Sequence, residues 1–174
     1  MSKKPLYLIC FFFVCTSERI QPRTEKLEWL NLSEASVKLK QQSKPILIDV
    51  YTDWCHWCKV MDVKTYSNKK VIDYLQQNFY VVKLNAETRD TLTWAARRFV
   101  YNSTYRINEF ALFATNGQAS FPTTVILLDD GTGPIPIPGY LQPRELELFV
   151  KYFGDRIYKT KTFPEYQKTF HASW

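Results

Sequence analysis

A pair of cysteines placed directly after a buried strand constrains this sequence more than any other feature. The run "ILIDVYT", Ile46 to Thr52, is almost entirely apolar and predicts a strand in the middle of a sheet. Cys55 and Cys58 follow at once, and a helix is expected to begin at or just after Cys55 and to run to about Val63. The pair is therefore expected at the N-terminal end of a helix.

The other cysteines of the chain lie in a different kind of sequence. There are four in all, and Cys10 and Cys15 belong to an apolar segment near the N-terminus. The rest of the chain holds only Cys55 and Cys58. This count excludes a scaffold held together by several disulfides.

Three chemistries are open to a pair with this spacing. A structural zinc site needs four ligands, usually from two such pairs, and only His56 and His171 offer ring nitrogens here. A purely structural disulfide that closes so small a loop constrains little of the unfolded chain. A redox dithiol fits best, because the N–H groups and the dipole at a helix N-terminus lower the pKa of a thiol. We therefore predict redox chemistry and no metal.

The N-terminal segment predicts export. Ser2-Lys3-Lys4 is a basic start, and the apolar run "PLYLICFFFVC" ends at a polar stretch, as in a secretory signal. The run is shorter than the roughly 20 apolar residues of a transmembrane helix. A buried N-terminal strand is the alternative. We assign residues 1–15 to a signal peptide and residues 16–26 to a linker.

Cys15 raises a second question about this segment. It closes the apolar run, as the lipidated cysteine of a bacterial lipoprotein does, but Val14 stands where such signals usually carry Gly, Ala or Ser. No A-x-A cleavage pattern is present either. Two forms stay open, a periplasmic protein and a membrane-anchored lipoprotein lipidated at Cys15.

Length and composition indicate one folded domain with appendages. The chain has 174 residues, of which 45% are hydrophobic and 16% aromatic, enough for a sizeable core. The net charge of +6 comes from basic residues that alternate with acids along most of the chain. We therefore expect a solvated, slightly basic surface and no nucleic-acid partner.

Helices and strands are expected to alternate along the chain. Besides the segments around the cysteines, helices are predicted from Ser33 to about Gln42, around residues 71–79, from Ser103 to about Thr115, and from Gln142 to Phe153. Strands are predicted at residues 27–30, 79–86, 123–129 and 135–140. For residues 87–102 a small hairpin is preferred to a helix, because Thr, Trp, Phe, Val and Tyr favour strands. The aromatic tail, residues 156–174, is expected to pack back on the domain.

Against this background the sequence resembles the thioredoxin superfamily. "PILIDVYTDWCHWCK" resembles the family's strand-loop-helix segment, in which Asp49 fills the acidic position six residues before the first cysteine. "SFPTTVILLDDG" resembles its cis-proline strand, which makes Pro122 the cis residue. Gly139-Tyr140 and the helix after it match the closing hairpin and helix.

The resemblance covers about residues 30–155 and implies a fold class. This is α/β, a thioredoxin-like fold with a mixed central sheet flanked by helices and a small insertion before the third helix. The domain would span residues 27–155. The stretch from "DWCHWCK" to "KLNAE" is similar to exported thioredoxin-like proteins and to the C-terminal domain of DsbD, a transmembrane electron relay.

The resemblance also implies roles for individual residues. Cys55 would be the attacking nucleophile, more exposed than Cys58, and Cys58 the resolving thiol. Asp49, desolvated below the pair, would have a raised pKa and accept a proton from Cys58, unless it is a partly solvated carboxylate at a strand end. Pro122 would place Phe121 against the disulfide, where an extended substrate pairs with the backbone. Phe121 departs from the smaller residue usual at this position.

The residues beside the cysteines leave alternatives open. A cationic His56 would favour the Cys55 thiolate, or it is a solvent-facing spectator. Trp57 offers an apolar contact to a partner or covers Cys58. Trp54 fills the family's flanking position and is counted, with these two, among the substrate-binding residues.

The function expected from these features is that of an exported, monomeric thiol–disulfide oxidoreductase without a cofactor. It would reduce disulfides of protein substrates in the periplasm and be recharged by a membrane electron donor of the DsbD type. A thiol oxidase or isomerase is the alternative direction. A binding or chaperone module of thioredoxin fold, using Trp57, Phe121 and Trp94, is the alternative class.

Overall fold

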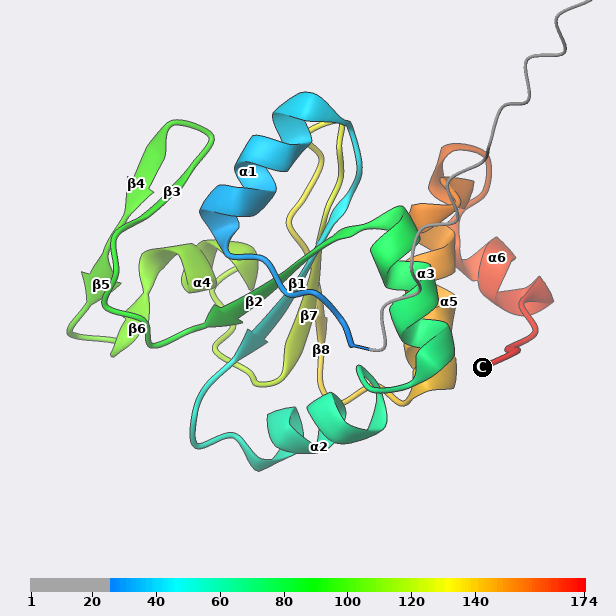
Figure 1. Cartoon of the computed structure of the whole chain (residues 1–174), viewed down its shortest axis with the longest axis horizontal. Helices are drawn as coiled ribbons and strands as arrows, with labels where there is room; N and C mark the ends of the chain where they lie inside the picture. Colours follow the sequence, from blue (N-terminus) through cyan, green and yellow to red (C-terminus); the bar gives the residue numbers. More distant parts are fainter. Residues whose placement is uncertain (1–25) are drawn as a thin grey trace, which may run out of the picture.

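The computed structural model describes residues 26–174 as a sheet covered by helices on both faces (Figure 1). The predicted signal peptide with Cys10 and Cys15, and all but the last residue of the predicted linker, lie outside the described residues. Within residues 26–174, no helix combines the length and apolar character that crossing a bilayer requires.

The central sheet is mixed and has the strand order β2-β1-β7-β8. Its strands are β1 (Ile46–Tyr51), β2 (Tyr80–Asn85), β7 (Thr123–Leu127) and β8 (Ile135–Pro138). β1 is parallel to β2 and antiparallel to β7, and β7 is antiparallel to β8. The two strands at the centre consist of the long apolar runs from which they were predicted.

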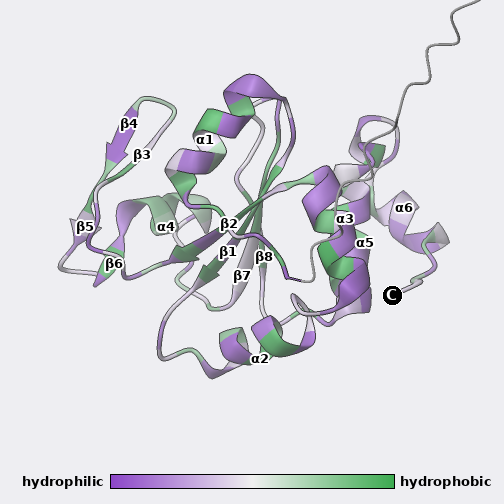
Figure 2. Cartoon of the chain, in the orientation of Figure 1, coloured by the Kyte–Doolittle hydropathy of each residue, from purple (hydrophilic) through white to green (hydrophobic). Residues whose placement is uncertain are grey.

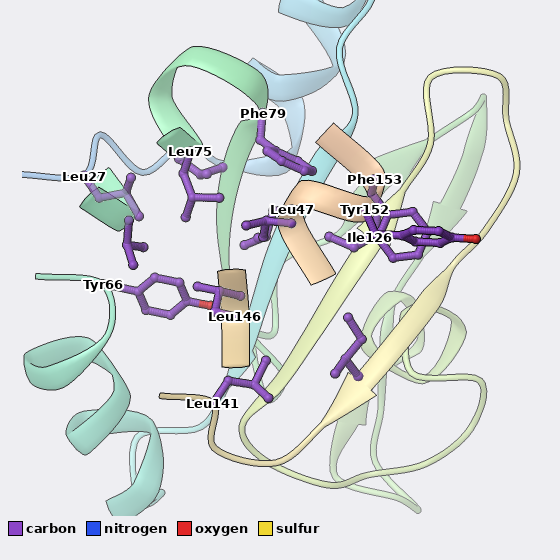
Figure 3. Packing of buried hydrophobic residues seen from close by; sticks show 14 of the residues in the cluster. Leu27, Leu47, Tyr66, Leu75, Phe79, Ile126, Leu141, Leu146, Tyr152 and Phe153 are labelled. Carbon is purple, nitrogen blue, oxygen red and sulfur yellow. The ribbon is translucent and has the colours of Figure 1, made fainter. Parts of the chain in front are cut away.

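Alternation along β1 divides the core into two clusters. Leu47 belongs to the cluster on one face, with residues of α3 (Lys69–Asn78) and α5 (Pro143–Gly154), as Figure 3 shows. Ile46, Ile48 and Val50 belong to the cluster on the other face, with residues of α1 (Leu32–Gln41) and α4 (Glu109–Ala114). Figure 2 shows the same pattern, with apolar residues concentrated in the strands and polar ones on outward helix surfaces.

Asp49 lies two residues after Leu47 on β1, so the two side chains point to the same face of the sheet. The parallel register sets Asp49 beside Lys83 of β2, and the antiparallel register sets it beside Thr124 of β7. The helix α2 (His56–Lys64) follows β1 and lies across the end of the sheet, at the bottom of Figure 1. The topology thus brings Asp49 and Lys83 next to the helix that begins after Cys55.

The predicted hairpin is confirmed, and a second one follows it. β3 (Leu92–Trp94) pairs with β4 (Arg97–Phe99), and β5 (Tyr101–Asn102) pairs with β6 (Ile107–Asn108). These hairpins form an insertion, residues 87–108, between β2 and α4, at the left of Figure 1. The predicted helix from Ser103 is therefore wrong over its first turns.

Two further boundaries differ from the prediction. The cap of α1 is Asn31, not Ser33, because Asn31 and Glu34 form a reciprocal capping box. The predicted strand at residues 27–30 is reduced to one parallel bridge between Leu30 and Val82. After α5, a short 3-10 helix (Ile157–Lys159) and α6 (Phe163–Thr169) return the tail to the α5 side.

Candidate active site

Cys55 and Cys58 form a disulfide at the N-terminus of α2. Their Cα atoms are 5.3 Å apart, and Cys55 is the N-cap residue of the helix. The Cys55 Sγ accepts a hydrogen bond from the Cys58 backbone N–H at 3.1 Å. This contact lies at the positive end of the helix dipole, so a thiolate at Cys55 would be stabilised there.

Both cysteines are almost fully buried, and Cys55 is the slightly more exposed of the two, in the expected order. The exposed fractions are 5% for Cys55 and 3% for Cys58, and the disulfide joins the two side chains. What separates them is position, since only Cys55 caps the helix. Residues 26–174 contain no cluster of three or more metal-ligating side chains.

Two exposed tryptophans flank the disulfide. The exposed fractions are 67% for Trp54 and 56% for Trp57. The Trp54 Nε1–H donates to Glu87 Oε1 at 3.1 Å, and its ring meets Phe121 edge-on with centroids 6.0 Å apart. Trp57 lies beside Tyr140, with ring centroids 5.6 Å apart.

The other predicted recognition residues gather on the same side. The Phe121–Pro122 peptide bond is cis. These two residues, with Trp57, Gly139 and Tyr140, line a hollow of about 300 Å³. His56, the first residue of α2, is exposed and contacts the ring of Trp57 at 5.8 Å. The structure therefore brings together Trp54, His56, Trp57, Phe121 and Pro122 around one surface.

Asp49 is buried and its charge is only partly compensated. Its exposed fraction is 1%, its Oδ2 lies 3.2 Å from Lys83 Nζ, and its Oδ1 has no hydrogen-bond partner among the described residues. Burial raises the pKa of Asp49 to about 6, although Lys83 lowers it and the charge of Asp62 raises it further. This excludes the alternative of a partly solvated carboxylate.

Lys83 and Asp62 belong to the same cluster, and the sequence analysis missed both. Lys83 Nζ also contacts Asp62 of α2, and it lies over the rings of Trp29, Tyr51 and Tyr66 at 4.9, 5.1 and 6.0 Å. The signal in the sequence is Lys83 itself, a charged residue inside the apolar run "FYVVKLNA". That Lys83 lies beside Asp49 was not predictable without the register of β1 and β2.

Together these features form a candidate active site with three components. A disulfide sits at a helix N-terminus, a carboxylate that titrates near neutral pH lies on the sheet beside that helix, and aromatic rings border the open side. Such an arrangement can exchange a disulfide bond with an extended partner and hold one proton while it does so.

Comparison with known proteins agrees with this geometry. The family model Thioredox_DsbH, described as "Protein of unknown function, DUF255", matches residues 19–152. A DsbH oxidoreductase superposes with a TM-score of 0.55 and 19% identity, covering 80% of this chain and 92% of that one, which shows the fold.

Two curated proteins are similar over shorter parts of their length. An uncharacterized protein of Caenorhabditis elegans is 28% identical over 112 residues, 64% of this chain and 14% of that protein. The thiol:disulfide interchange protein DsbD of Campylobacter jejuni is 22% identical over 116 residues, 67% of this chain and 17% of that protein. The chain thus spans less than a fifth of these relatives.

Proposed function

We propose that this chain, which belongs to the Thioredox_DsbH family, is a thiol–disulfide oxidoreductase that reduces protein disulfides outside the cytoplasm. The observation that carries the proposal is the disulfide at the N-terminus of α2, the helix whose Asp62 shares Lys83 with the buried carboxylate of Asp49. The apolar N-terminal run and the similarity to DsbD support export, either as a periplasmic protein or as a lipoprotein anchored through Cys15.

The proposed cycle starts from a Cys55 thiolate and a Cys58 thiol. The thiolate attacks one sulfur of a substrate disulfide, that bond breaks, and the other substrate sulfur leaves as a thiolate that takes a proton from water. Cys58 then gives its proton to Asp49 and attacks the Cys55 sulfur. The second substrate thiolate leaves and takes that proton, so the substrate gains two electrons and two protons while Cys55 and Cys58 become a disulfide.

The pKa of Asp49 suits this step. With a value of about 6 the carboxyl group is mostly ionised at neutral pH, yet basic enough to take a thiol proton transiently. Lys83 and Asp62 would act as positioning residues, because both contact or perturb Asp49 without a place in the bond exchange. A dithiol of a DsbD-type membrane donor would return the chain to its reduced form.

Substrate contacts are proposed for the surface around the disulfide. An extended segment would pair with the backbone at Phe121 and Pro122 and pack against Trp54, His56 and Trp57. We propose residues 27–155 as the catalytic domain and a monomer as the working form.

Replacement of the resolving cysteine tests the proposal. Cys58→Ala should accumulate mixed disulfides with substrate proteins through Cys55, and these should disappear on treatment with a thiol. Cys55→Ala is the matched control and should trap none. The wild-type chain should also reduce insulin when a dithiol is supplied. A chain that reduces no disulfide and traps no partner would contradict the proposal.

A second function is favoured by the exposed indoles of Trp54 and Trp57. A binding or chaperone module would use this apolar surface independently of the thiols. Such a module should retain its partners in the Cys55→Ala, Cys58→Ala double variant, whereas a reductase should lose the covalent complexes.

A further inference from the structure

A second hollow lies beside the disulfide, on the side of Trp54. It has a volume of about 500 Å³ and is lined by Trp54, Glu87, Tyr105, Arg106, Ile107, Ala119 and Phe121. Four of these residues, Glu87 and residues 105–107, come from the insertion. Trp54 directly precedes Cys55 in the sequence, so one wall of the hollow is formed by the residue next to the one that carries the reacting sulfur.

The two hollows meet at Phe121. Phe121 lines the hollow beside Trp57 and Tyr140 as well as the one beside Trp54. A partner segment that crosses Phe121 and Pro122 would therefore reach the edge of the second hollow. This continuity extends the surface of the reaction onto a part of the chain outside the sheet.

The walls of the second hollow are fixed before a partner arrives. Trp54 is held by Glu87 through its indole N–H and by the edge-on contact with Phe121. Opposite, Asn102 Oδ1 accepts from the backbone N–H groups of Thr104 and Tyr105 and so shapes the turn of the β5–β6 hairpin. A site whose walls are already ordered loses little entropy on binding.

The charged side chains that line the hollow are Glu87 and Arg106. The insertion holds four arginines, at positions 89, 97, 98 and 106, and two acidic residues, Glu87 and Asp90, and Glu109 follows it as the first residue of α4. Glu87 accepts from Trp54, Asp90 bonds Thr88, and Glu109 accepts from the Val100 N–H. Arg106 is exposed and forms no ion pair among the described residues.

We propose that the hollow beside Trp54 binds the flank of an extended peptide substrate and that Arg106 pairs with an acidic side chain of that flank. The proposal rests on the proposed function, since the peptide is the segment around a substrate cysteine. Trp54 and Tyr105, with exposed fractions of 67% and 70%, supply the apolar sides of the groove. Arginine is suited to this contact because its planar fork matches a carboxylate.

The test uses the reduced full chain and symmetric disulfide dimers of eight-residue peptides. Each peptide has one cysteine and one variable position, occupied by Asp or Asn, placed before the cysteine in one series and after it in another. Bis(2-hydroxyethyl) disulfide, which has no flank, is the reference substrate. Rates of thiol release are measured after acid quenching by chromatography at low and high salt.

The wild-type chain should reduce the Asp peptide of one series about two- to five-fold faster than the Asn peptide, the range expected for an exposed ion pair. Salt should reduce this ratio toward one. Arg106→Gln should abolish the ratio. Arg98→Gln is the matched control, because it removes the same charge from an exposed arginine outside the hollow; it should keep the ratio.

Glu87 provides a check in the opposite direction. Glu87→Gln keeps an acceptor for the Trp54 indole but removes a negative charge from the hollow, so the ratio should rise. An equal loss of the ratio in Arg106→Gln and Arg98→Gln, or no preference for Asp in the wild-type chain, would overturn the inference. In those cases reduction of the reference substrate would leave the proposed function standing, whereas failure with every disulfide would overturn both.

Discussion

At the scale of single residues, the cluster around Lys83 places one cation between two carboxylates. Lys83 Nζ contacts Asp49 and Asp62 while three aromatic rings surround it. Cation–π attraction and ion pairing both favour the charged ammonium. Burial makes the ionised form of Asp49 costly, and Lys83, which also pairs with Asp62, offsets only part of that cost.

Replacement of Asp49 by Asn should change how stability depends on pH. The pKa of Asp49 is raised from 3.8 to about 6, so the folded chain keeps a proton that the unfolded chain releases between these values. Stability should therefore fall as pH rises through this window, by about 3 kcal/mol. Asp49→Asn should remove the fall. Urea denaturation at pH 4 and 7 measures it, and equal pH dependence in both proteins would refute the prediction.

The two neighbours of Asp49 should act in opposite directions. Lys83→Met should raise the pKa of Asp49, because it removes an attractive charge and a hydrogen bond, and Asp62→Asn should lower it, because it removes a repulsive charge. The shift should be larger in Lys83→Met than in Asp62→Asn, because Lys83 acts on Asp49 through both its charge and a hydrogen bond. Carboxyl NMR chemical shifts followed through a titration measure the midpoint. A shift of the Asp49 pKa in the same direction in both variants would contradict the opposite effects assigned to Lys83 and Asp62.

At the scale of elements, asparagine side chains set where three of the helices begin. Asn31, Asn68 and Asn108 cap α1, α3 and α4, and Cys55 occupies the same position in α2. Asn108 does more than cap, since its Nδ2 also donates to the carbonyl oxygens of Thr88 and Asp90. It therefore ties the start of the insertion to the start of α4.

Asn108→Ala should destabilise the chain by about 2 kcal/mol, because it removes the cap of α4 and leaves two partly buried carbonyl groups without their donor. Asn31→Ala, at an exposed cap, should cost about 1 kcal/mol. Denaturant titration of the two variants compares these costs. If Asn31→Ala were the more harmful, the insertion would not depend on Asn108.

The elements also show which features the sequence was able to predict. β1, β2 and β7 followed from apolar runs, and Asp49 with the cysteines followed from their order along one segment. The cap of α1 did not, because Asn31 and Ser33 have similar capping preferences and only Glu34 decides between them. Lys83 and Asp62 were missed because sheet register and helix placement, both long-range, bring them to Asp49.

At the scale of the whole molecule, the end of the chain is anchored on one buried carboxylate. Glu147 of α5 is fully buried and accepts from the Ser173 N–H at 2.7 Å, the Ser173 hydroxyl at 2.5 Å and the Trp174 N–H at 3.0 Å. Lys151 Nζ lies 2.6 Å from its Oε1. Residues far apart in the sequence thus close the cluster of α3 and α5.

Acid should release this anchor. Burial alone would raise the pKa of Glu147, but the hydrogen bonds from Lys151, Ser173 and Trp174 hold it below its usual value of 4.5. The stabilisation is therefore present above pH 4.5 and is lost as pH falls below it. Glu147→Gln should lower the free energy of unfolding by about 2 kcal/mol at pH 7, and less at pH 3.5.

Glu28→Gln is the control for Glu147→Gln, because Glu28 is an exposed carboxylate. Denaturation of the three proteins at both pH values makes the comparison. A constant difference between wild type and Glu147→Gln across this range would mean that the anchor does not titrate.

The placement of Trp54 and Trp57 has an optical consequence. Each indole directly precedes one of the two cysteines, and the excited state of an indole is quenched by a nearby disulfide. Emission from these side chains should therefore brighten when the bond opens and dim when it closes. The fluorescence of Trp54 and Trp57 should therefore report the oxidation state of the two cysteines without an added dye, also during turnover.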